Sequence, residues 1–250
     1  MNRYLFIFDL DYTLLDTGAL RGAISRAAEA QGVPAENFTA WYRARPSARE
    51  DWHMNFPLEH ISEEFPQADV AHLRRGLELL ALSSSEFLYP DTLHALVRLR
   101  NAGHELAVCT YGEREFQTQK VRHAHIEHLL SAVRVTRDVE KAHDVEELCA
   151  QAHSRLGHVQ AFFVEDNPMA LAAAKMRCPH IITVLIQRIE GGIYAEFDDQ
   201  RPFIDHIVKN MQGFEEVVEG YADSPEEKIL PVRQKNSWIP SHLAKIIGKK

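Results

Sequence analysis

The stretch Tyr4-Leu5-Phe6-Ile7-Phe8-Asp9-Leu10-Asp11-Tyr12-Thr13 is an apolar run that ends in two aspartates. A short continuous apolar run is typical of a strand that is buried on both faces of a parallel sheet. Side chains two residues apart in a strand point the same way, so Asp9 and Asp11 should project together from its carboxyl end. Open α/β sheets bind ligands at that edge, and two carboxylates there suit a divalent cation and a phosphoryl group. Taken alone, such a pair could also begin a turn or cap a helix.

Strands and helices alternate in the second half of the chain. Apolar runs at 106–109, 161–164 and 181–186 are separated by helical stretches, and a predicted helix at 92–102 stops at Gly103. Strands that alternate with helices indicate βαβ units and a parallel sheet. We therefore expect an α/β protein with a Rossmann-like parallel sheet.

The region between the first strand and this alternation has helical periodicity. Leu20, Ile24 and Ala28 are spaced at i, i+4, and a similar pattern recurs from Val70 to Leu80. The predicted organisation has three parts. An α/β core is formed by residues 1–17 and 88–222, a small α-helical domain by 18–87, and a basic tail by 223–250. The apolar residues of the tail favour packing over contact with an acidic partner.

The overall composition restricts the class of protein. The chain has 250 residues, 45% of them hydrophobic, and a formal net charge of −8, which argues against general binding to nucleic acid. Cys109, Cys149 and Cys178 form no C-x-x-C pattern, so neither a disulfide framework nor a zinc knuckle is expected. The first apolar run is too short for a signal-peptide core, and 181–186 is too short to span a bilayer. These features predict a soluble cytoplasmic protein that binds no membrane.

Further polar residues follow the later strands. Thr110 follows the run 106–109 and precedes Tyr111-Gly112 at the start of a predicted helix, where a hydroxyl and backbone N–H groups could hold phosphate oxygens. Lys141 follows the strand 133–135, and its ammonium could balance negative charge in a transition state. Each has an ordinary alternative, since threonine often caps helices and most lysines lie on the surface. Lys120, in the preceding helix, competes with Lys141 for this role.

The run 161–164 also ends in acids, Glu165 and Asp166, with a helix expected to start near Pro168. The strings at 8–17, at Thr110, at Lys141 and at 165–166 resemble, in this order, the four motifs of the haloacid dehalogenase-like (HAD) superfamily. The resemblance covers roughly residues 4–210. Two departures from the family pattern stand out: Ala142 replaces a frequent proline, and Ala170 and Leu171 stand where some members carry a further aspartate.

The resemblance implies a Mg²⁺-dependent phosphatase with a helical cap inserted after the first motif. Asp9 would be the nucleophile and would form an aspartyl-phosphate, while Asp11 would protonate the leaving oxygen and then activate water. The side chains of Asp9 and Asp166 and the carbonyl of Asp11 would bind Mg²⁺, with Glu165 as a further candidate ligand. The phosphoryl group would be held by four residues: Thr110, Tyr111, Gly112 and Lys141.

Several functions remain open at this point. Dehalogenases of the superfamily generally lack the second acid, so Asp11 favours a phosphatase. A phosphomutase shares these core residues, and a non-catalytic phosphate-binding or interaction protein is a third alternative, although the intact pair of aspartates argues against it. The substrate is expected to be a small phosphorylated metabolite of unknown identity. Arg45 and Arg49 could bring a guanidinium to a second anionic group on it, or could simply lie on the surface.

Overall fold

The computed structural model describes residues 3–37, 56–112, 114–136, 141–157, 159–189 and 197–222. Within these ranges a parallel sheet of six strands has the order β3-β2-β1-β4-β5-β6. The central strand is β1, the apolar run at the start of the chain, which pairs with β2 on one side and β4 on the other. The strand bounds are β1 Tyr4–Phe8, β2 Glu105–Tyr111, β3 Ala132–Thr136, β4 Gln160–Glu165, β5 Ile182–Ile186 and β6 His206–Val208.

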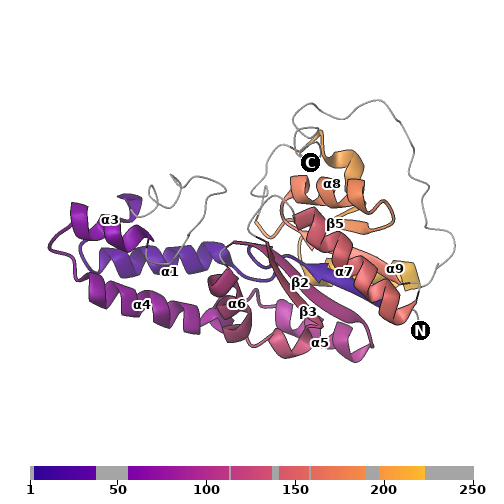
Figure 1. Cartoon of the computed structure of the whole chain (residues 1–250), viewed down its shortest axis with the longest axis horizontal. Coiled ribbons are helices and arrows are strands. Elements are labelled where there is room, and N and C mark those ends of the chain that lie inside the picture. The colour runs from indigo at the N-terminus through magenta and orange to yellow at the C-terminus, as the bar shows by residue number, and fades with distance from the viewer. Residues whose placement is uncertain are drawn as a thin grey trace.

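Helices cover both faces of this sheet (Figure 1). Alternate residues of β1 point to opposite faces, so Phe6 and Phe8 pack with α5 and α9 in one apolar cluster, whereas Leu5 and Ile7 pack with α7 and α8 in another. Burial on both faces explains why β1 is apolar throughout. The bounds of these helices and of α6 are α5 Thr92–Asn101, α6 Arg114–His123, α7 Lys141–Leu156, α8 Pro168–Arg177 and α9 Met211–Ala222.

Within the described residues, a helical unit is formed by α1 (Thr17–Glu29), α3 (Phe56–Glu64) and α4 (Val70–Leu82). They share an apolar cluster of their own that includes Ala28 and Leu73. In Figure 1 this unit lies at one end of the long axis and the sheet at the other. The chain passes between the sheet and this unit near Asp16 and again near Phe87. These two segments lie side by side, since the backbone N–H of Asp16 donates to the carbonyl oxygen of Phe87. Short 3-10 turns complete the described elements: Ser84–Phe87, Glu127–Leu129 and Arg201–Phe203.

The predicted α/β class with a Rossmann-like parallel sheet is confirmed. Helix α5 ends two residues before Gly103, whose φ of +87° is a conformation that favours glycine. One boundary differs, because β2 continues through Tyr111 instead of ending at Thr110. Its partner β3 pairs Tyr111 with Thr136, so the ladder extends the strand. The domain boundaries remain a prediction, and 223–250, Arg45 and Arg49 lie outside the described residues.

Among the described helices, none combines the length and apolar character that crossing a membrane requires.

Candidate active site

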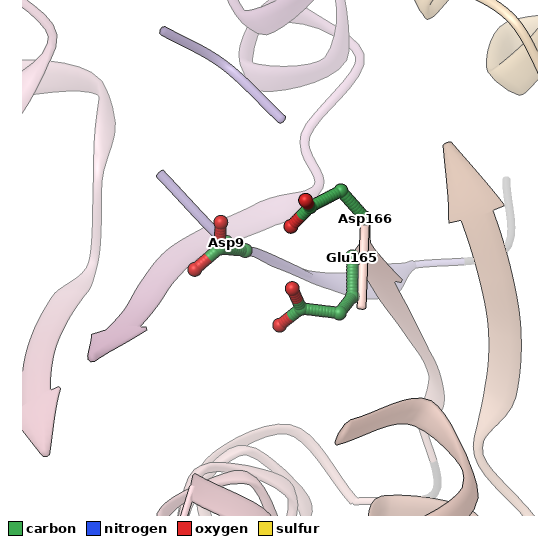
Figure 2. A group of neighbouring side chains, drawn as sticks. All are labelled: Asp9, Glu165 and Asp166. Carbon is green, nitrogen blue, oxygen red and sulfur yellow. The ribbon is translucent and has the colours of Figure 1, made fainter. Parts of the chain in front are cut away.

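The strands β1 and β4 bring three acids together at the carboxyl edge of the sheet. Phe8 pairs with Val164, and the backbone N–H of Asp9 donates to the Val164 carbonyl oxygen at 2.9 Å. Asp9 therefore lies beside Glu165 and Asp166, and one carboxylate oxygen from each lies within 4.8 Å of the others. Figure 2 shows the side chains of Glu165 and Asp166 extending from the end of β4 toward the side on which Asp9 lies.

Lys141 lies against this acid cluster, defined here as Asp9, Glu165 and Asp166. It is the first residue of α7, and its Nζ lies 2.5 Å from Asp9 Oδ1 and 2.5 Å from Glu165 Oε2. Burial lowers the pKa of Lys141, but the charges of Asp9 and Glu165 raise it more, so the pKa lies above its ordinary value. One ammonium thus faces three carboxyl groups, so ionisation of all three would leave a surplus of negative charge.

The surplus is visible in the pKa values of two of the acids. Burial, reinforced by the charge of Glu165 and offset in part by Lys141, raises the pKa of Asp9 to about 7. Burial and the neighbouring carboxylates raise the pKa of Asp166 to about 10. Clustered carboxylate oxygens are the ligands that Mg²⁺ prefers, and a bound cation would supply the missing positive charge. The donor set therefore fits a magnesium ion.

The two oxygens of Glu165 distinguish it from the other two acids. Oε2 accepts from Lys141, and Oε1 accepts the backbone N–H of Asn167 at 3.1 Å. Because both oxygens already accept a hydrogen bond, Glu165 is better placed to hold Lys141 than to bind a metal. Asp9 and Asp166 are then the better candidates for side-chain ligands.

Asp166 does not cap the helix that follows it. Asn167 is the N-cap of α8, and its side chain accepts the backbone N–H of Met169 at 3.0 Å. We therefore expect Asp166→Ala to weaken Mg²⁺ binding by about 10-fold or more while the protein stays folded. Isothermal titration with Mg²⁺ or Mn²⁺ measures the first effect, and thermal melts measure the second.

Asp69→Ala is the matched control for this prediction. Asp69 caps α4 in the helical unit, where its side chain accepts the N–H of His72 at 2.8 Å. Its loss should lower stability by about 1 kcal/mol and leave Mg²⁺ affinity unchanged. Equal Mg²⁺ affinity in wild type and a folded Asp166→Ala protein would contradict the assignment.

The raised pKa values predict how metal-free stability depends on pH. A carboxyl whose pKa is higher in the folded protein binds a proton there at pH values where the unfolded chain has lost it. Its contribution to the free energy of unfolding must therefore fall as pH rises, between about 4 and 7 for Asp9 and further toward 10 for Asp166.

In EDTA, the melting temperature of wild type should drop relative to that of Asp166→Asn between pH 5 and pH 8. Added Mg²⁺ should stabilise wild type more as pH rises, because metal ligands must be deprotonated. A difference between the two proteins that is independent of pH would refute this.

Thr110 lies at the same edge of the sheet as Asp9. β2 runs beside β1 with Val108 opposite Phe8, and Thr110 comes two residues later. Its side chain is buried, and Oγ1 has no hydrogen-bond partner within the part of the chain that the structure describes. Buried hydroxyls are almost always paired, so this one is suited to a ligand oxygen.

Tyr111 and Gly112 are less well suited to phosphate than the sequence suggested. Tyr111 is the last residue of β2 and is exposed, while the N–H of Gly112 donates to the carbonyl oxygen of Thr136 at 3.0 Å. That bond would have to open before Gly112 could bind a phosphate oxygen. Gly112 has a φ of +146°, and a Cβ there would lie 2.8 Å from Gln117 Nε2, so only glycine fits.

Asp11 is separate from the acid cluster in its contacts. Its two oxygens accept hydrogen bonds from Lys120 at 2.6 Å each, from Gln117 at 2.8 Å and from Thr17 at 2.5 Å. Burial raises the pKa of Asp11, but the charge of Lys120 and these hydrogen bonds lower it more, so the pKa lies below its ordinary value. Lys120 thus pairs with Asp11, whereas Lys141 pairs with Asp9 and Glu165.

Neither Gln117 nor Thr17 was predicted as a site residue, and Lys120 was predicted only as a rival of Lys141. One signal was available: Gln117 and Lys120 are three residues apart in a predicted helix and so share a face. That spacing alone does not reveal which carboxylate the face meets.

A parallel sheet that carries acids, a threonine and a lysine at its carboxyl edge is the arrangement expected of a hydrolase of the HAD type. A family model described as haloacid dehalogenase-like hydrolase matches residues 5–176. The chain therefore belongs to the haloacid dehalogenase-like hydrolases. A search of curated proteins found no match.

Solved structures agree with this fold. A protein described as a haloacid dehalogenase-like hydrolase from Burkholderia xenovorans LB400 aligns with a TM-score of 0.62 at 19% identity, covering 89% of this chain and 99% of that one. A predicted phosphoglycolate phosphatase from Haemophilus somnus 129pt aligns with a TM-score of 0.57 at 16% identity, covering 87% and 99%. A dehalogenase aligns with a TM-score of 0.60 at 20% identity, covering 87% and 98%. At these identities the likeness concerns the fold alone.

Proposed function

We propose that the protein is a Mg²⁺-dependent phosphatase that hydrolyses a small phosphorylated metabolite through an aspartyl-phosphate. The observation that carries the proposal is the acid cluster of Asp9, Glu165 and Asp166 with Lys141 against it, at the carboxyl edge of the sheet. Membership of a hydrolase family that includes phosphatases supports it.

In the proposed reaction Asp9 Oδ attacks phosphorus and the bond from phosphorus to the leaving oxygen breaks. Lys141 stabilises the negative charge that develops on the transferring group, and the Thr110 hydroxyl contacts one of its oxygens. Asp9, Asp166 and the Asp11 carbonyl would hold Mg²⁺, whose positive charge would reduce the repulsion between Asp9 and phosphate. A water molecule then attacks phosphorus, which releases phosphate and regenerates the Asp9 carboxylate.

Asp11 carries the proton in both steps of this scheme. It gives a proton to the leaving oxygen and later takes one from the attacking water. In the structure its contacts favour the ionised form, so Asp11 must take up a proton before it can act as an acid. The negative charge of a bound phosphate favours that uptake, because a nearby like charge raises the pKa of a carboxyl.

The helical unit is proposed as the cap, which would exclude bulk water from the site. The segment from α1 to α4 that contains Arg45 and Arg49 would then help to select the substrate. A phosphomutase of the same superfamily remains the runner-up, because the core residues are the same. If Arg45 and Arg49 contact the substrate, replacing both with alanine should lower kcat/KM. If they simply lie on the surface, kcat/KM should stay unchanged.

The test is a screen of phosphorylated metabolites and p-nitrophenyl phosphate with purified protein and Mg²⁺, followed by measurement of free phosphate. We expect turnover of at least one ester, and loss of turnover after metal stripping in excess EDTA. A parallel assay of halide release from 2-haloacids tests for dehalogenation, and an assay of phosphate transfer between sugar positions tests for a mutase. Full turnover without metal would contradict the proposal, as would an inert wild type.

A further inference from the structure

The carboxylate of Asp11 is held by donors from two different parts of the fold. Lys120 and Gln117 reach it from α6, and Thr17 reaches it from the first turn of α1 in the helical unit. The four hydrogen bonds divide equally between Oδ1 and Oδ2. The carboxylate is therefore fixed in one orientation, although a quarter of its side chain is exposed.

Lys120 is buried to an unusual degree for a lysine. The residue is 2% exposed, and its Nζ lies on both oxygens of Asp11 and 5.1 Å from the centre of the Phe116 ring. Burying an ammonium is costly, and pairing it with a carboxylate often only offsets that cost. Stability alone therefore gives no reason for a lysine at this position.

Gln117 connects the same carboxylate to the end of β2. Its Nε2 donates both to Asp11 Oδ2 at 2.8 Å and to the carbonyl oxygen of Tyr111 at 2.6 Å. A Cβ at position 112 would lie 2.8 Å from this Nε2, so Gly112 leaves the space that the amide occupies. Through Gln117, the Asp11 carboxylate is tied to the strand that carries Thr110.

We propose that Lys120, assisted by Gln117, is a positioning residue that fixes the Asp11 carboxylate for its part in the reaction. This inference rests on the proposed function, which gives Asp11 the transfer of a proton. Lys120 acts through Asp11 and touches neither the acid cluster nor Lys141 in the described contacts. Its role thus differs from that of Lys141, which lies on the nucleophile.

Lys120→Met removes the ammonium and keeps a side chain of similar length. We expect kcat to fall roughly 10- to 100-fold, a part of the contribution typical of general acid–base catalysis. KM should change little, because Asp11 is not proposed to bind the phosphate of the substrate. Lys120→Arg, whose guanidinium can donate to both oxygens of a carboxylate, should recover part of kcat.

The decisive measurement is a double-mutant cycle of Lys120→Met with Asp11→Asn. If Lys120 acts through Asp11, the second change should add little to the loss of kcat caused by Asp11→Asn. Each single variant should also melt below wild type, because it leaves a buried charge without its partner, and the double variant should recover stability. If Lys120 only supports the local fold, the two losses of kcat should multiply.

Lys175→Met is the matched control. Lys175 lies on α8, away from the acid cluster, with its Nζ 2.7 Å from Asp205 Oδ2 and 2.6 Å from the carbonyl oxygen of Ile181. Its loss should lower the melting temperature and leave kcat and KM unchanged. The comparison separates the cost of breaking a partly buried ion pair from an effect on the reaction.

The possible outcomes separate the two proposals. The positioning role alone is overturned if wild type is active and the folded Lys120→Met protein retains full kcat. It is also overturned if the losses of kcat in the double-mutant cycle multiply. A wild type that hydrolyses no phosphoester with Mg²⁺ overturns the proposed function and the positioning role together. An active wild type with a selective loss of kcat and a non-additive cycle supports both.

Discussion

Asp9→Asn should reduce phosphate release by roughly four orders of magnitude or more, as expected when the nucleophile of a covalent mechanism is removed. The amide has nearly the size of the carboxylate but is no nucleophile, and the neighbouring acids are not proposed to replace it in line with phosphorus. The variant should also label no longer with phosphate in a rapid-quench experiment that labels wild type.

The same variant should stay folded. Burial and the charge of Glu165 disfavour the ionised form of Asp9, and the amide oxygen of asparagine can still accept from Lys141. Thermal melts in EDTA at pH 8 should therefore show a melting temperature equal to or above that of wild type. A folded Asp9→Asn protein with turnover near that of wild type would overturn the covalent mechanism.

Lys141→Ala should lower kcat by roughly 10²-fold or more, the loss typical of removing a preorganised electrostatic group. It should also destabilise the protein, because Asp9 and Glu165 lose the ammonium that lies 2.5 Å from each. Breaking a buried ion pair by removing one partner typically costs about 3–5 kcal/mol. Steady-state kinetics and urea unfolding measure the two effects.

Metal provides the internal control for Lys141→Ala. Mg²⁺ restores positive charge beside the acids, so the loss of stability should be smaller in saturating Mg²⁺ than in EDTA. Lys175→Ala, the loss of a lysine paired with Asp205 away from the acid cluster, should lower stability without lowering kcat. An equal effect of both lysines on kcat would show that Lys141 acts only through the fold.

Much of the candidate site is encoded locally and could be predicted from the sequence. Asp9, Thr110 and the pair 165–166 each follow an apolar run, and parallel strands place their carboxyl ends at one edge of a sheet. The order of the motifs therefore indicated that Asp9, Thr110 and Asp166 meet. Confirmation of the sheet shows that this reasoning was sound for the fold, while the chemical roles of the residues stay predictions.

Boundaries and pairings depended on residues far apart in the chain. The strand β2 includes Thr110 and Tyr111 because Tyr111 pairs with Thr136 of β3, and that pairing also engages the N–H of Gly112. Local propensity around 110–112 contains no information about a partner strand 25 residues later. The predicted start of a helix there was accordingly too early, since α6 begins at Arg114.

The sequence by itself determined the class of fold and the acids at its carboxyl edge, because burial of short apolar runs and the direction of parallel strands are local consequences of residue type. Only the tertiary structure decided which lysine meets which acid. By their position in the sequence, both Lys120 and Lys141 were candidates for the lysine of the site. The packing of α6 and α7 against the sheet places Lys120 next to Asp11 and Lys141 next to Asp9. A charge interacts with whatever lies within a few ångströms of it, and that distance is set by packing between helices and not by order along the chain.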